Sequence, residues 1–130
     1  MNTFPETSCS ILSFEEPDLL RSVSKPYVEM TVESVKEDTK AVKDLIKGAP
    51  YYLLFISDTT ATYTKEAREY MDNDLEQLKK AEALVVNSLG HRIIANFYTR
   101  TRRRHHPIRV FATDLEAREW INSLREREVK

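Results

Sequence analysis

Polar and apolar residues are interleaved in two short stretches near the start of the chain. Ser10–Phe14 carries this pattern, which predicts a strand with one buried face. Glu15–Asp18 contains a proline and predicts a turn, and Leu19–Val23 then predicts a returning strand. Together the three segments predict an antiparallel hairpin.

A helix and a buried strand are expected next. Apolar residues recur at three- and four-residue steps over about 32–47. Thr31 can cap the N-terminus of this helix, and Gly48 can end it in a left-handed conformation. Tyr51–Ile56 is a continuous apolar run, which predicts a strand buried on both faces, as in a parallel sheet covered by helices.

The second half of the chain continues this alternation. A hydroxyl-rich loop, Ser57–Thr64, leads to a helix that begins at Lys65, with Thr64 as the preferred N-cap, and that continues or restarts through Leu78. A second helix is expected over 91–100, with one apolar face turned to the core. Strands are predicted over 83–86 and 108–111, and a last helix follows the capping box of Thr113 and Glu116.

These elements predict an α/β fold. Strands that alternate with helices imply a mixed, largely parallel sheet with an N-terminal hairpin and four helices. The length of 130 residues suits one domain, which we assign to residues 1–130 with a core at about 10–125.

Composition argues against several classes of function. The single cysteine, Cys9, cannot form an intramolecular disulfide, and no zinc-ligand spacing is present. Two glycines are too few for a dinucleotide-binding loop or a P-loop. No apolar run approaches the ~20 residues of a membrane span, and Met1–Ser10 lacks the pattern of a secretion signal. We therefore expect a cytoplasmic protein that is not an enzyme and has no cofactor or metal.

Charge is sorted along the chain although the net charge is only −1. From Ala83 to Thr113 there is no Asp or Glu, while six arginines and all three histidines lie there. The dense part of this stretch comprises Arg100, Arg102, Arg103, Arg104, His105 and His106. It can cap a helix C-terminus as a solvated loop, or it can bind an acidic partner, an anionic membrane surface or nucleic acid. The acidic remainder of the chain argues against nucleic acid.

Several short segments resemble a known family. They are A-E-A-L-V-V-N-S at 81–88, R-I-I-A-N-F at 92–97, P-I-R-V-F at 107–111, E-A-x-x-W-I at 116–121 and T-K-E-A-R at 64–68. Together they resemble uncharacterised bacterial STAS-like proteins, which are similar to anti-sigma-factor antagonists and to lipid-binding Sec14-type STAS relatives. The resemblance extends over Ser10–Leu124 and implies the same α/β fold.

This resemblance also implies a style of function. STAS-type domains are generally not enzymes; they bind partner proteins, and some bind nucleotides or apolar ligands. Phosphorylated members carry a Ser or Thr after the third strand, in an Asp-Ser-Ser-Gly-like stretch. This chain has no glycine there, and Ser57, Asp58, Thr62 and Thr64 are the candidates for a phosphosite or partner loop. The leading hypothesis is a regulatory domain that binds an unknown protein, with a homodimer as one form.

A carrier of an apolar ligand is the competing hypothesis. The aromatic and methionine side chains that recur on the helices suit a core, but they can also line a pocket; they are Tyr70, Met71, Phe97, Tyr98 and Trp120. The carrier hypothesis requires a cavity of at least about 300 Å³ between helices and sheet.

Overall fold

A five-stranded mixed sheet forms the centre of the protein. The computed structural model describes residues 6–70, 72–101 and 106–129. The strand order is β1-β2-β4-β6-β7, with β1 and β2 antiparallel and the other neighbours parallel. The strands are β1 (Ser10–Glu16), β2 (Leu19–Ser24), β4 (Tyr51–Ile56), β6 (Lys79–Val85) and β7 (Ile108–Phe111). The predicted hairpin and the largely parallel sheet are confirmed.

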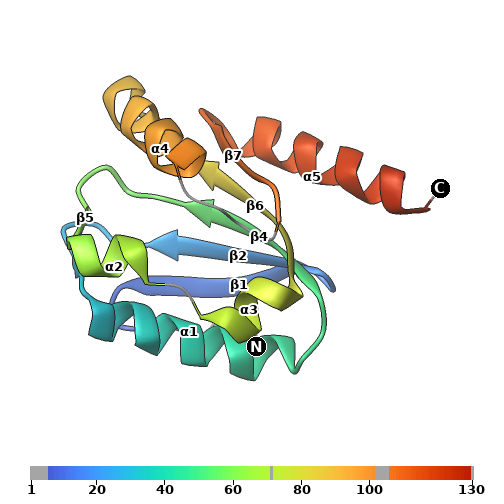
Figure 1. Ribbon diagram of the computed structural model, residues 1–130, viewed down its shortest axis with the longest axis horizontal. Coiled ribbons are helices and arrows are strands. Elements are labelled where there is room, and N and C mark those ends of the chain that lie inside the picture. Colours follow the sequence, from blue (N-terminus) through green and yellow to red (C-terminus); the bar gives the residue numbers. More distant parts are fainter. Residues whose placement is uncertain (1–5, 71, 102–105, 130) are drawn as a thin grey trace.

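The helices form a layer on each side of this sheet. In Figure 1, α1, α2 and α3 lie together along one face, while α5 runs along the other and α4 stands at the end near β7. The helices are α1 (Val32–Ile46), α2 (Lys65–Glu69), α3 (Asn73–Leu78), α4 (Leu89–Thr101) and α5 (Asp114–Val129). The expected helix over 65–78 is therefore two short helices, and the described residues form five helices rather than four.

Side-chain caps explain where the helices begin. The hydroxyls of Thr31 and Thr64 accept hydrogen bonds from the third amide of their helices, as predicted. The break between α2 and α3 has the same cause, because the Asp72 carboxylate accepts from the Leu75 amide at 3.1 Å and starts a new helix. At the start of α5, the Thr113 hydroxyl accepts from the Glu116 amide and donates to its carboxylate.

A second, two-stranded sheet was not predicted. It pairs β3 (Glu29–Met30) with β5 (Thr62–Tyr63) in parallel. The Thr62 amide donates to the Val28 carbonyl at 2.9 Å, and the Thr64 amide donates to the Met30 carbonyl at 3.0 Å. These bonds fix the hydroxyl-rich loop against the segment that leads into α1.

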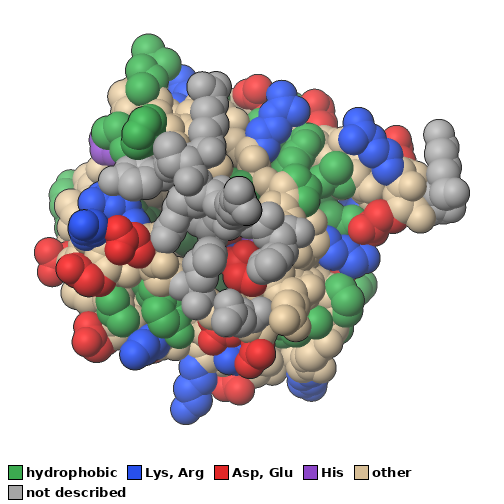
Figure 2. Space-filling model, in the orientation of Figure 1, with side chains coloured by type: hydrophobic (Ala, Val, Ile, Leu, Met, Phe, Trp, Pro, Cys, Tyr) green, Lys and Arg blue, Asp and Glu red, His purple; other side chains and the backbone are tan. Residues whose placement is uncertain are grey.

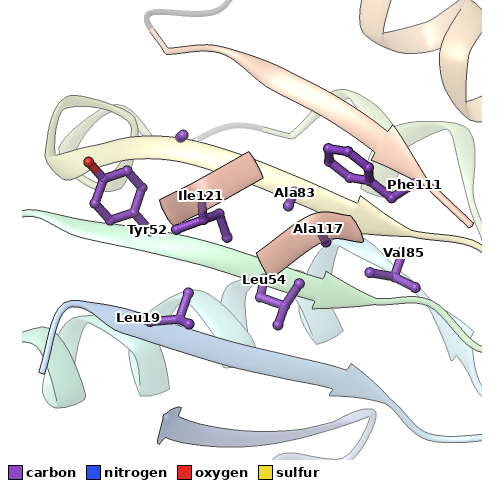
Figure 3. Packing of buried hydrophobic residues seen from close by; sticks show 9 residues of the cluster. Leu19, Tyr52, Leu54, Ala83, Val85, Phe111, Ala117 and Ile121 are labelled. Carbon is purple, nitrogen blue, oxygen red and sulfur yellow. The ribbon is translucent and has the colours of Figure 1, made fainter. Parts of the chain in front are cut away.

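The face of the sheet under α5 is tightly packed. Figure 3 shows its buried cluster: Leu19, Tyr52, Leu54, Ala83, Val85 and Phe111 from the sheet, and Ala117 and Ile121 from α5. Arg125 ties the far part of α5 to the hairpin turn through Asp18 and Glu16. Ala117 and Ile121, four residues apart on α5, have no exposed surface, so this side of the helix packs against the sheet.

The helix α4 departs from the prediction. Its apolar face was expected in the core, but Ile93, Ile94 and Phe97 are 63%, 56% and 64% exposed. Helical periodicity shows which residues share a face, and it does not show whether the rest of the fold covers that face. The strand β6 (Lys79–Val85) also begins four residues before the strand predicted over 83–86.

Candidate functional site

A cavity of about 690 Å³ lies between the sheet and the helices α1–α4. Its floor is the face of β4 and β6 opposite to α5. On the α5 side, Tyr52, Leu54 and Ala83 are almost wholly buried, at 1% exposed or less. On the cavity side, their strand neighbours Leu53, Phe55 and Leu84 stay half-buried. The strands β4 and β6 are therefore fully covered on the face under α5, while their other face borders the cavity.

Polar groups lie at the carboxyl-end edge of the sheet, where ligands bind in open α/β folds. Ser57, Asp58 and Thr62 all line the cavity there. The Asp58 amide donates to the Ser24 hydroxyl at 2.7 Å. Its carboxylate accepts from the Thr60 hydroxyl and from the Thr60 amide at 2.8 Å, and these bonds lower the pKa of Asp58. Asp58 thus stays ionised and shapes the loop.

The candidate phosphosite residues differ in how accessible they are. The Thr64 hydroxyl is engaged as the cap of α2, accepting from the Ala67 amide at 3.1 Å. The Ser57 hydroxyl lies 3.4 Å from the Tyr63 hydroxyl. Thr62, in contrast, is exposed. The structure brings Ser57, Asp58 and Thr62 to one edge of the cavity and gives Thr64 a structural hydrogen bond.

A buried group of charged residues, which the sequence pattern did not predict, lies at the opposite end of the cavity. The Lys79 ammonium is 2.8 Å from the Glu82 carboxylate and 3.5 Å from that of Glu76. The His106 ring lies 3.3 Å from Glu76. The side chains of Lys79, Glu82, Glu76 and His106 are between 2% and 13% exposed. We call these four residues the buried charge cluster.

The electrostatics of this cluster keep Lys79 charged. Burial lowers the pKa of Lys79, but the carboxylates of Glu82 and Glu76 outweigh burial and raise it above its usual value. Tyr51 lies beside the cluster, and burial raises the pKa of its hydroxyl to about 12. His106 was assigned to an exposed basic patch, but it is buried against acidic groups and therefore contributes no surface charge. Of the rest of that patch, 102–105 and the Arg100 side chain lie outside the described residues.

Asp38 of α1 is a further ionisable group on the cavity wall. Burial raises the pKa of its carboxyl, while hydrogen bonds from Thr7 and from Ser10, the latter at 2.7 Å, act in the opposite direction. The effect of burial is the larger, so the pKa of Asp38 stays above its usual value although both carboxylate oxygens accept a hydrogen bond. Across the described part of the chain, no three His, Cys, Asp or Glu side chains are grouped so as to hold a metal ion.

Comparison with known proteins places the chain in a family. A family model described as "Domain of unknown function (DUF7793)" matches residues 13–125, which is most of the chain. The protein belongs to the DUF7793 family. No curated protein matches this DUF7793 chain significantly.

The fold of this DUF7793 protein is similar to a solved structure. That structure is an uncharacterised protein of the DUF3478 family, with a SpoIIAA-like fold, from Shewanella loihica PV-4. The TM-score is 0.57 at 13% sequence identity, over 92% of this chain and 98% of the other. The likeness confirms the predicted STAS-like fold. None of the described helices of the DUF7793 protein is both long and apolar enough to cross a membrane.

Proposed function

We propose that this protein is a non-catalytic binding domain that holds an apolar or amphipathic small molecule between its sheet and the helices α1–α4. The observation that supports this most is the unequal burial of the two sheet faces. The cavity of about 690 Å³ exceeds the minimum set by the carrier hypothesis and lies within the range of small-molecule sites, about 300–1,000 Å³.

The arrangement of polar groups suggests the shape of the ligand. The middle of the cavity floor is apolar, formed by Leu53, Phe55 and Leu84. Ser57 at one end and Lys79 at the other are separated by the length of β4, roughly 20 Å at about 3.3 Å per residue. An elongated molecule with an apolar body and a polar group at an end fits this lining.

Two ionisable groups of the cavity, Lys79 and Asp58, support binding rather than catalysis, while Asp38, whose pKa burial raises, accepts hydrogen bonds from Thr7 and Ser10 on its two carboxylate oxygens. A nucleophilic lysine needs a lowered pKa, and that of Lys79 is raised. A general acid needs a raised pKa, and that of Asp58 is lowered. Neighbouring residues keep Lys79 and Asp58 in fixed charge states, as expected for side chains that line a binding site.

A substitution that fills the cavity tests the proposal. Leu84→Trp places a larger side chain on the cavity floor, while Leu124→Trp makes the same change in a half-buried residue on the α5 side. We expect the neutral fluorophore N-phenyl-1-naphthylamine to bind the wild type and the Leu124→Trp control. Leu84→Trp should weaken its binding by at least tenfold. Equal binding by the two tryptophan variants, with both folded by circular dichroism, would place the probe elsewhere.

Partner binding through the Ser57–Thr64 loop is the second candidate function. Three threonines of this loop, Thr59, Thr60 and Thr62, are exposed in a segment that the β3–β5 pair holds in place. A phosphate on Thr62 would add nearly two negative charges beside the cavity edge. Thr62→Glu should change the proteins recovered in a pull-down from the native host, with Thr62→Ser as the control. Identical recoveries from both variants would exclude a role for charge at this position.

A further inference from the structure

The helix α4 exposes a continuous apolar stripe to solvent. Leu89, Ile93 and Phe97 are spaced four residues apart and therefore lie on one side of the helix. They are 67%, 63% and 64% exposed. Figure 2 shows hydrophobic side chains gathered at the corner of the molecule where α4 stands. Contiguous apolar surface of this kind marks an interaction site.

The opposite side of α4 is less apolar than this stripe. His91, Ala95 and Thr99 line the cavity, and among the described side chains of α4 only Ile94 adds a large apolar group to that wall. The strongly apolar side of α4 is thus directed away from the protein's own core. Because burial of apolar surface is favourable, a partner that covers the stripe would gain binding free energy from it.

The charge of the sequence around α4 indicates which kind of partner covers the apolar stripe. The sequence from Ala83 to Thr113, which contains the whole of α4, has six arginines and no acidic residue. Arg92 lies within α4, and its guanidinium donates to the Val86 carbonyl at 2.9 Å. A symmetric dimer through α4 would bring two such segments together and make them repel each other. A surface of negative charge would instead attract the helix.

We propose that α4 binds the surface of an anionic membrane, with Leu89, Ile93 and Phe97 inserted at the level of the lipid headgroups. A basic helix with Leu and Phe on one side is the composition of helices that lie in a membrane interface. The stripe stands on a corner of the molecule rather than in a groove, so it suits insertion into a bilayer (Figure 2). On its other side the same helix walls the cavity, so α4 lies between the bilayer and the ligand site.

Vesicle flotation tests this proposal. The wild type should bind vesicles of equal parts phosphatidylcholine and phosphatidylglycerol, and binding should weaken as salt rises. It should not bind vesicles of phosphatidylcholine alone. Insertion of one Leu or Phe side chain shifts a partition coefficient by about tenfold. Leu89→Ser combined with Phe97→Ser should therefore reduce binding at least tenfold.

A matched control lies on α5. Leu115 is 67% exposed, as Leu89 is, but Asp114 and Glu116 flank it. Leu115→Ser should leave vesicle binding unchanged, and all variants should keep the wild-type melting temperature. Binding that survives the double change would overturn the proposal. So would a wild-type dimer that the double change converts to a monomer, since a second copy would then cover the stripe. Both outcomes leave the ligand proposal untouched, because the fluorophore assay reads the cavity separately.

Discussion

Removing the charge of Lys79 should destabilise the protein strongly. Lys79→Met keeps a long side chain but leaves the carboxylates of Glu76 and Glu82 without the ammonium that lies 3.5 Å and 2.8 Å away. The side chains of these glutamates are only 5% and 13% exposed, so water can solvate their carboxylates only weakly once the ammonium is removed. Breaking a buried ion pair from one side costs about 3–5 kcal/mol. In a chain of 130 residues this lowers the melting temperature by about 10–20 °C.

The neighbouring Lys80 provides a control. It pairs with Glu128 at 3.1 Å, but both side chains are more than one-third exposed. Lys80→Met should therefore cost less than about 1 kcal/mol of unfolding free energy. Urea unfolding at one neutral pH measures both variants. Equal costs for the two lysines would refute the assignment of a buried charge cluster.

Titration of Lys79 should not change the stability of the wild-type protein over the neutral pH range. The folded-state pKa of Lys79 is raised, so its stabilising contribution is present in full below about pH 10.5, the usual lysine value. That contribution is lost only as pH rises beyond that value. A wild-type stability that fell between pH 7 and pH 9 would have to come from another group.

Three further predictions concern the core, the tyrosines and a helix cap. Ile121→Ala should lower the free energy of unfolding by about 2–5 kcal/mol, because this side chain has no exposed surface. Ile93→Ala on α4 should change it by no more than about 0.5 kcal/mol. Similar losses for the two variants in urea unfolding would contradict the outward placement of α4. Burial raises the pKa of Tyr51 and of Tyr52 to about 12, so stability should fall as pH rises from about 10 to 12, and tyrosinate absorbance of the folded protein should lag behind that of the unfolded chain. Full ionisation near pH 10 without unfolding would show that these hydroxyls are accessible. Thr113→Ala removes the cap of α5 and should cost about 1 kcal/mol, with Thr113→Ser restoring most of it in thermal unfolding.

Local patterns were sufficient to predict the sheet and most helix boundaries. The hairpin, the run Tyr51–Ile56 and the cap Thr31 each depend on residues close together in sequence, and each is confirmed. The break between α2 and α3 also has a local cause, the cap Asp72, which could have been found because an aspartate is a preferred N-cap residue and Leu75 and Leu78 follow it at helical spacing.

The cavity could not be predicted from such patterns. Leu53 and Leu54 are identical residues next to each other, and only the unequal covering of the two faces leaves one half-buried and the other fully buried. The buried charge cluster combines Glu76 with His106, which are distant in sequence and meet only when β6 and β7 pair. No short window of sequence contains that contact.

Native mass spectrometry of protein purified gently from its host tests the central claim most directly. We expect a species heavier than the bare chain by the mass of one small molecule, which organic solvent removes. Leu84→Trp, purified in the same way, should lack that species, while Leu124→Trp should retain it. A wild-type chain that carries no extra mass, and that takes up no N-phenyl-1-naphthylamine when the probe is added, would contradict a ligand site between the sheet and the helices α1–α4.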